Sequence, residues 1–147
     1  MIDKSVKNLG YAGDLTPLQT WQLLSDDPSA VVIDVRTPEE WSYVGVPNLD
    51  NLKRGLYFVP WAFYPRMSPN PDFIEDVKRE ACPKSDTPLL FLCRSGVRSL
   101  HAARALTDAG FSECYNILGG FEGDADETQH RGTLNGWKVD GLAWVQK

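Results

Sequence analysis

The sequence has no apolar run long enough to cross a membrane. Its first residues, Met1 to Ser5, lead into no apolar segment of the kind that a secretion signal contains. Basic residues are also too few for a nucleic-acid-binding face, since 15 lysines and arginines stand against 20 acidic residues and leave a net charge of −5. We therefore expect no membrane association and no nucleic-acid partner.

Cysteine is scarce as well. The three residues Cys82, Cys93 and Cys114 form no C-x-x-C pair, so the sequence predicts no structural zinc site. An odd number of cysteines, with a candidate nucleophile among them, favours a reducing compartment and predicts a cytoplasmic location. We expect Cys82 and Cys114 to be packed thiols without a catalytic role.

At 147 residues the chain has the length of one domain with a sizeable core, and we expect a single domain over residues 1–147. Residues 1–14 show no hydrophobic period, so they are predicted to be a loosely packed lead-in to that domain.

One cysteine lies between two strongly patterned segments. Residues 89–92 are a short apolar run that predicts a buried strand, and the stretch from Leu100 to Ala109, closed by Gly110, predicts a helix. Cys93 therefore lies where a strand turns sharply into a helix. The free amide N–H groups at the helix start, the helix dipole and two arginines in the loop all favour a thiolate there.

The residues that make this turn are Cys93-Arg94-Ser95-Gly96-Val97-Arg98-Ser99. They resemble the active-site loop of the rhodanese family, the sulfurtransferases that carry sulfur as a cysteine persulfide. Protein tyrosine phosphatases place five residues between their loop cysteine and arginine, whereas four separate Cys93 from Arg98. The shorter loop makes a smaller anion-binding nest, which suits a sulfur atom better than a tetrahedral phosphate.

Two capping boxes predict where other helices begin. Thr16 starts a predicted helix that reaches about Leu24, and Thr37 starts a short one that runs through Trp41. A further helix is predicted over residues 70–81. Apolar runs predict strands at residues 30–33, 56–59, 89–92 and 113–118.

Strands that alternate with helices predict an α/β fold, in which a parallel sheet is covered on both faces. The resemblance implies a rhodanese-like domain with five parallel strands and helices on both sides. It extends to the stretch Asp34-Val35-Arg36 and the helix start that follows, which are similar to the family's other signature.

Several segments follow strands, so we expect them at the carboxyl edge of the sheet, where ligands bind in such folds. They are Arg36, the aromatic loop 60–69, Cys93 and residues 119–135. Compared with shorter family members, residues 122–135 are a polar, acidic insertion. The loop 60–69, which contains Trp61, and this insertion are the expected walls of the site.

Cys93 is the predicted catalytic nucleophile. Arg94, Ser95, Gly96, Val97, Arg98 and Ser99 are predicted to bind the substrate. Asp34, Arg36 and Trp61 are possible supporting residues, although an ion-paired structural role for Asp34 and Arg36 remains open. His101 shares a polar helix stripe with Arg104 and Asp108 and is not expected to act as a base, and His130 is expected at the surface.

The resemblance implies that Cys93 takes sulfane sulfur from thiosulfate or a similar small anionic donor, and passes it to a thiol or to a partner protein. No metal and no organic cofactor is expected. Three other functions remain open from the sequence: a sulfur-relay partner of another enzyme, with the aromatic loop as docking surface; a cysteine-dependent phosphatase or arsenate reductase; and, least favoured because the cysteine is present, a non-catalytic rhodanese-like module.

Overall fold

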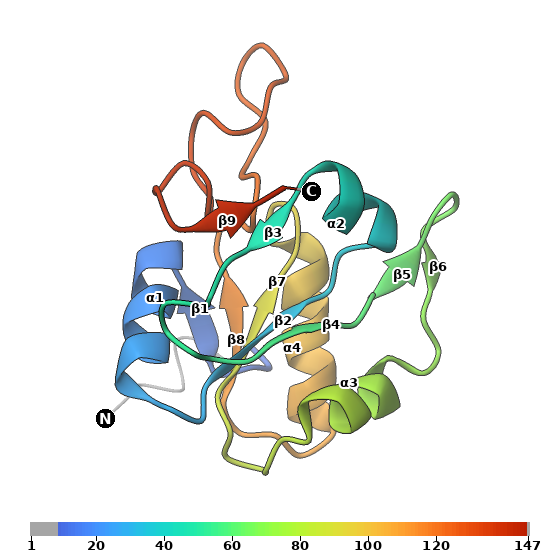
Figure 1. Cartoon of the computed structure of the whole chain (residues 1–147). Helices are drawn as coiled ribbons and strands as arrows, with labels where there is room; N and C mark the ends of the chain where they lie inside the picture. Colours follow the sequence, from blue (N-terminus) through green and yellow to red (C-terminus); the bar gives the residue numbers. More distant parts are fainter. Residues whose placement is uncertain (1–8, 147) are drawn as a thin grey trace.

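Five parallel strands form the central sheet, in the spatial order β1-β8-β7-β2-β4 (Figure 1). The computed structural model describes residues 9–146. The strands are β1 (Gly13–Leu15), β2 (Val31–Asp34), β4 (Leu56–Phe58), β7 (Leu89–Leu92) and β8 (Cys114–Ile117). The predicted α/β class with five parallel strands is confirmed. Since all five run the same way, their carboxyl ends share one edge, as predicted for Arg36, Cys93 and the 60–69 and 119–135 segments.

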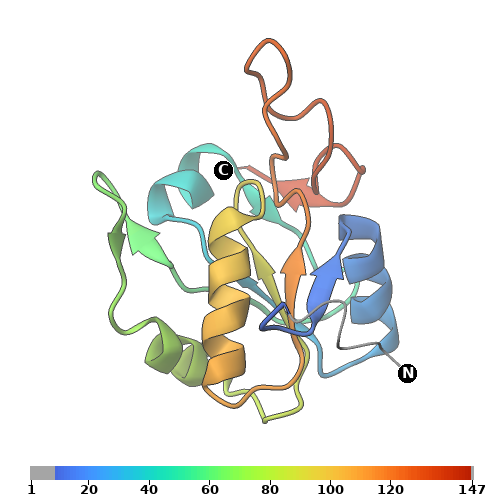
Figure 2. The same ribbon diagram turned by 180° about the vertical axis from the view of Figure 1, so that it is seen from behind.

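Helices cover both faces of this sheet, again as predicted. One face carries α3 (Phe73–Ala81) and α4 (Val97–Asp108), whose apolar side chains form a core with Ile33 and Phe91. Figure 2 shows α4 lying across the sheet on this side. On the other face, α1 (Pro17–Asp26) contributes Leu24 to a second core that includes the fully buried Trp137.

The capping boxes fix two helix starts as the sequence predicts. At the start of α1, the Thr16 side chain accepts from the backbone N–H of Gln19, whose side chain accepts from the Thr16 N–H in return. Thr37 and Glu40 make the same exchange at the start of α2 (Pro38–Tyr43), which follows the carboxyl end of β2. The second box therefore anchors α2 at the ligand-binding edge.

Two small antiparallel pairs lie outside the central sheet, and the sequence predicted neither. Residues 60–69, expected to be a loop, contain the pair of β5 (Ala62–Phe63) and β6 (Ser68–Pro69). The pair of β3 (Val46–Pro47) and β9 (Trp144–Val145) joins the end of the chain to the region after α2. Each strand has only two residues, too few to show a period-2 pattern.

The prediction that residues 1–14 form a loosely packed lead-in was wrong for the part that the structure describes. Residues 13–15 are β1, the edge strand that pairs with β8, and Tyr11 is buried in the core. Residues 1–8 lie outside the described residues. Between residues 9 and 146, no helix has the length and apolar character that a membrane span requires.

Candidate active site

Cys93 is the first residue after β7 and is 1% exposed. The chain then turns at Gly96, whose φ of 108° lies in the left-handed region that favours glycine. This conformation points the Gly96 N–H back at the cysteine, and it donates to Cys93 Sγ over 3.0 Å. The N-terminal end of α4 thus contributes one amide hydrogen bond to the sulfur, together with the positive end of the helix dipole.

The outer side of the loop is clasped by the segment after β8. The Phe121 N–H donates to the Cys93 carbonyl over 2.8 Å, and the N–H groups of Glu122 and Gly123 donate to the Arg94 carbonyl over 3.0 and 3.1 Å. The two segments lie so close that a side chain on Gly120 would collide with the Cys93 carbonyl oxygen. The base of the insertion therefore holds the cysteine loop in place.

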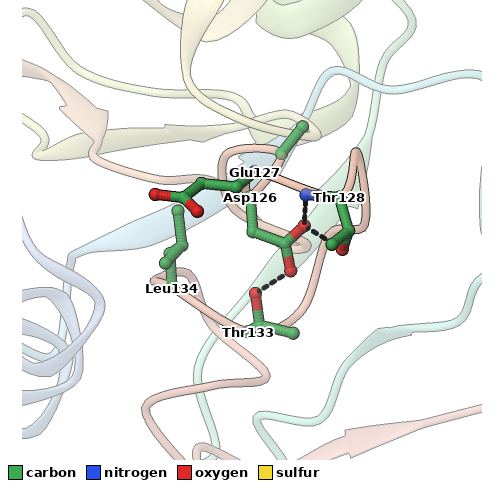
Figure 3. A pocket seen from close by; sticks show the side chains of 6 residues that line it. Asp126, Glu127, Thr128, Thr133 and Leu134 are labelled. Atoms are coloured by element: carbon green, nitrogen blue, oxygen red, sulfur yellow. Dashed lines mark hydrogen bonds between the residues drawn. The ribbon is translucent and has the colours of Figure 1, made fainter.

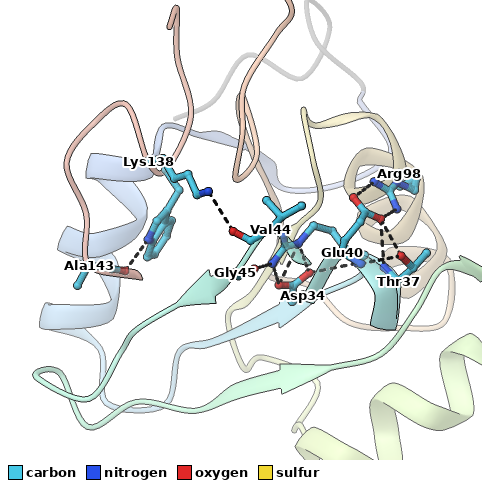
Figure 4. Close-up of polar contacts among 10 residues, drawn as sticks. Asp34, Thr37, Glu40, Val44, Gly45, Arg98, Lys138 and Ala143 are labelled. Atoms are coloured by element: carbon cyan, nitrogen blue, oxygen red, sulfur yellow. Dashed lines mark hydrogen bonds and ion pairs between the residues drawn. The ribbon is translucent and has the colours of Figure 1, made fainter. Parts of the chain in front are cut away.

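Arg98 forms a two-point ion pair with Glu40 of α2 (Figure 4). Its two terminal nitrogens donate to the two carboxylate oxygens over 2.7 and 2.9 Å, and both side chains are largely buried. Thr37 also donates to this carboxylate through its N–H and its hydroxyl. The capping box of α2 therefore positions the carboxylate that holds Arg98.

Burial alone would raise the pKa of the Glu40 carboxyl, but the hydrogen bonds and charge of Arg98, with those of Thr37, outweigh it and hold that pKa below its usual value. Burial would likewise lower the pKa of Arg98, and Glu40, with Cys93 close by, raises it instead. Both groups are therefore charged at neutral pH, and the positive charge that the sequence predicted beside Cys93 is largely balanced by Glu40.

Asp34 and Arg36 form a fully buried ion pair, the structural alternative that the sequence left open. The Arg36 Nε and one terminal nitrogen donate to the Asp34 carboxylate over 2.9 and 2.7 Å, and the same terminal nitrogen donates to the Gly45 carbonyl over 2.8 Å. The guanidinium carbon lies 4.4 Å from the centre of the Phe121 ring. This pair connects β2 to the turn after α2 and to the residue that clasps the cysteine loop.

A chain of hydrogen bonds runs from Cys93 to the edge strand β1. Cys93 Sγ lies 3.2 Å from the Ser99 hydroxyl oxygen, and that hydroxyl donates to Asn116 Oδ1 over 2.6 Å. The Asn116 amide nitrogen donates to Asp14 over 3.1 Å, and the Tyr11 hydroxyl donates to the same Asp14 oxygen over 2.7 Å. Ser99 thus touches the sulfur from inside the protein.

The other predicted site residues lie farther from the sulfur or face outward. Arg94 and Val97 are exposed, and Ser95 is partly buried. Trp61 packs edge-on against Phe73 of α3, with 4.9 Å between ring centres, and stacks on the exposed His101. The structure therefore brings Gly96, Ser99 and Arg98 around Cys93, whereas Trp61 belongs to the contact between the β5–β6 pair and the helices.

The other two cysteines differ from each other. The prediction that Cys82 is packed was wrong: it is exposed and lies just past the end of α3, where it adopts a left-handed conformation with φ of 46°. Cys114 is buried in β8 as predicted, and burial raises the pKa of its thiol to about 11. At neutral pH Cys114 is therefore protonated and shielded, a poor nucleophile.

The insertion folds around its own acidic residue, Asp126 (Figure 3). The Asp126 carboxylate accepts hydrogen bonds from Thr128, His130 and Thr133, which hold the pKa of the carboxyl well below its usual value. A hollow of about 640 Å³ is lined by residues of the insertion alone, from Ala125 to Leu134. The loop is an internally ordered structure that projects from the edge bearing Cys93 (Figure 1).

Comparison with family models, curated proteins and solved structures shows which family the chain belongs to. The model of the rhodanese-like domain matches residues 16–127, more than half of the chain. The chain belongs to the rhodanese-like family. The solved structure of Rv0390 from M. tuberculosis matches this rhodanese-like domain with a TM-score of 0.85 and 46% identity, over 93% of this chain and 99% of that one.

Curated relatives agree on the family. An uncharacterized protein of Rickettsia conorii, RC0915, is 37% identical over 126 residues, which is 86% of this chain and 91% of its own length. The chloroplastic thiosulfate sulfurtransferase 16 of Arabidopsis thaliana is 38% identical over 92 residues, 60% of this chain and 68% of that protein. Proteins named for sulfur transfer are thus among the relatives of this rhodanese-like domain.

The sequence did not single out three residues that are connected to the cysteine loop through hydrogen bonds: Glu40 through Arg98, Asn116 through Ser99, and Asp14 through Asn116. Glu40 was identified only as part of a capping box. Asn116 did leave a signal, because it is a polar residue in the middle of an apolar strand, where an amide needs buried hydrogen-bond partners. Asp14 left none, since it is exposed and lies in a segment without a recognisable period.

Proposed function

We propose that the protein is a sulfurtransferase that moves sulfane sulfur through a persulfide on Cys93. The observation that carries the proposal is the sulfur of Cys93 at the base of a four-residue loop, where it accepts the Gly96 amide hydrogen bond at the start of α4. An amide donor and a helix N-terminus favour an anionic sulfur. The same features favour the terminal sulfur of a persulfide, which would lie one bond beyond Sγ.

In the first half-reaction, the Cys93 thiolate attacks the outer sulfur of thiosulfate. A sulfur–sulfur bond forms at Cys93 and the sulfur–sulfur bond of the donor breaks, so sulfite leaves with the bonding electron pair. The cysteine retains one negative charge, now on the terminal sulfur. The exposed Arg94 would attract the donor dianion, and Arg98, whose charge Glu40 largely balances, would contribute less.

In the second half-reaction, a thiophilic acceptor attacks the terminal sulfur and releases the Cys93 thiolate. Cyanide serves as acceptor in an assay, and a thiol or a partner protein would serve in a cell. Since the cycle needs a free thiolate and all three cysteines are unpaired, the proposal includes a reducing compartment such as the cytoplasm. The proposed steps use only side-chain and backbone groups and call for no metal and no organic cofactor.

Intact mass spectrometry after incubation with thiosulfate tests this function directly. We expect the wild-type protein to gain the mass of one sulfur atom and to lose it again when cyanide is added. Hydrolysis of p-nitrophenyl phosphate should be very slow, because the loop is too short to enclose a tetrahedral phosphate. Phosphatase turnover that equals sulfur transfer would overturn the proposal in favour of a cysteine-dependent phosphatase.

We expect the insertion to affect the rate of sulfur transfer to the acceptor more than the rate of persulfide formation from the donor. Replacing residues 124–134 with a short Gly-Ser link should change the kinetics with bulky thiol acceptors and leave persulfide formation from thiosulfate nearly unchanged. The replacement keeps Phe121, Glu122 and Gly123, whose amides clasp the cysteine loop. Stopped-flow rates of the two half-reactions measure the two effects separately. If neither rate changes, the insertion has no part in the reaction.

A further inference from the structure

The orientation of the Asn116 side-chain amide is fixed by its neighbours. Its nitrogen lies 3.1 Å from an oxygen of Asp14, and an ionised carboxylate only accepts hydrogen bonds, so the NH₂ group must face Asp14. Tyr11 donates to the same Asp14 oxygen. Asn116 Oδ1 therefore faces Ser99, and among residues 9–146 the Ser99 hydroxyl is the donor that satisfies it.

Ser99 has a single hydroxyl proton, so it cannot donate to two acceptors at once. The 2.6 Å bond to Asn116 Oδ1 uses that proton, which leaves only lone pairs to face Cys93 Sγ at 3.2 Å. A neutral thiol fits this arrangement, because its S–H can donate to Ser99. A thiolate keeps the hydrogen bond from the Gly96 amide, but it has no proton to give to Ser99 and therefore meets an oxygen lone pair on that side.

If the Ser99 hydroxyl turned toward a thiolate, Asn116 Oδ1 would be left without a hydrogen-bond donor. Asn116 is only 3% exposed, so water cannot replace the lost donor at little cost. A persulfide avoids the conflict: its negative charge lies mainly on the terminal sulfur, one bond beyond Sγ. The Ser99 proton can then stay on Asn116.

We propose that Asn116 is a positioning residue that holds the Ser99 proton away from Cys93, and so shifts the site from the free thiolate toward the sulfur-loaded form. This inference rests on the proposed function and adds a residue to it. The poorly solvated thiolate is also the stronger nucleophile toward the donor, since a less stabilised anion is more reactive. The reaction itself is the balanced transfer given above, with no further reactant.

Other charged groups around the sulfur contribute a background that the test must hold constant. They are Arg94 in the loop, Arg98 at the start of α4 with its partner Glu40 of α2, and the Asp34–Arg36 pair at the end of β2. Asp14 lies behind Asn116. Of these charged residues, only Asp14 is changed in any of the variants below.

The test is a titration of the Cys93 thiolate by its ultraviolet absorbance, with each protein measured against the same protein carrying Cys93→Ser. We expect Asn116→Leu to lower the pH midpoint by about one unit, because Ser99 becomes free to donate to the thiolate. In a Ser99→Ala background the same change should have no effect, since Asn116 would act only through Ser99. Tyr115→Phe, a matched change in β8 whose hydroxyl bonds Glu113, should leave the midpoint unchanged.

Equal shifts with and without Ser99, or no shift in either background, would overturn the proposal. If Asn116→Leu does not fold, Asp14→Ala decides the matter, because Asp14 is exposed and its removal lets the amide reverse and release the Ser99 proton. The Ser99-dependent part of its shift should also lower the midpoint, and the absence of such a part would contradict the proposal. The charge removed with Asp14 acts equally in both backgrounds and cancels in the comparison.

A second measurement connects the residue to sulfur loading. At a pH above the titration midpoints of both proteins, where free Cys93 is thiolate, and at a fixed ratio of thiosulfate to sulfite, the ratio of persulfide to free Cys93 should fall about tenfold in Asn116→Leu, the same free-energy change as one pH unit. An unchanged ratio would contradict the proposal. If the wild-type protein forms no persulfide at all, the sulfurtransferase function fails, while the absorbance titration still tests the role of Asn116.

Discussion

Replacing Cys93 with serine should abolish both the gain of one sulfur atom from thiosulfate and the transfer of sulfur to cyanide. A serine hydroxyl lies in the same position but is protonated at neutral pH, and its oxygen forms no stable bond to sulfane sulfur. No other cysteine can replace Cys93. Cys114 is buried with its pKa raised to about 11, and Cys82 lies at the far end of α3, away from the loop.

The matched controls are Cys82→Ser and Cys114→Ser, each measured by intact mass and by steady-state kinetics. Both should retain the sulfur gain and the activity. In Cys114→Ser, the new hydroxyl can keep the hydrogen bond that the thiol donates to the Phe111 carbonyl. Loss of activity in either control, with the circular dichroism spectrum unchanged, would show that a second cysteine takes part in the cycle.

Arg98→Ala should have the second largest effect, and it should act on stability and on substrate binding together. The substitution leaves the Glu40 carboxylate buried without its partner, which costs about 3 kcal/mol of unfolding free energy. It also replaces a positive charge beside Cys93 with an uncompensated negative one that repels thiosulfate. We expect KM for thiosulfate to rise about 10- to 150-fold.

Two further variants separate the effects of Arg98→Ala. The double variant Arg98→Ala with Glu40→Gln removes the uncompensated carboxylate, so it should regain most of the stability and lose the part of the KM increase that this charge causes. The KM increase that remains measures the contact of Arg98 itself with the donor. Arg98→Lys should recover only part of both, because a point charge cannot make the two-point contact. If Arg98→Ala leaves thiosulfate kinetics unchanged, Arg98 is a structural residue only, and the sulfurtransferase proposal stands without it.

Glu40→Gln alone reports the pH dependence of the same pair. The carboxyl has a pKa of 4.5 in its ordinary state and a lower one in the folded protein. The ionised pair therefore stabilises the fold above pH 4.5, and this contribution is lost as the pH falls through the folded-state pKa. In urea unfolding, the difference between wild type and Glu40→Gln should shrink as the pH falls below 4.5. A difference that is constant with pH would mean that Glu40 titrates alike in both states.

The sequence predicts those parts of the structure that depend on near neighbours. Thr16 and Thr37 each lie three residues before the side chain that completes a capping box, so both helix starts were correct. The strand and helix on either side of Cys93 were also correct, because each has a strong apolar pattern. These local patterns were enough to predict the fold class and the position of the cysteine at the strand-to-helix turn.

Contacts between distant residues were not predictable in the same way. Glu40 and Arg98 are 58 residues apart, and nothing in either segment shows that α2 lies beside the start of α4. The hydrogen bond between Asn116 and Asp14 spans 102 residues. Cys82 itself adopts the left-handed conformation that follows α3. Because that conformation favours glycine and Cys82 is not glycine, the sequence did not indicate it.

The edge strand β1 shows that the segment matched by a family model and the segment that forms the sheet need not have the same limits. The family model begins at residue 16, one position after β1 ends. A fragment cut at that boundary would lose the strand that covers β8, leaving the backbone of β8 open to pair with other chains. It would also lose Asp14, the outermost anchor of the polar chain that begins at Cys93. Such a fragment would retain every residue of the cysteine loop and still be a different, more aggregation-prone protein.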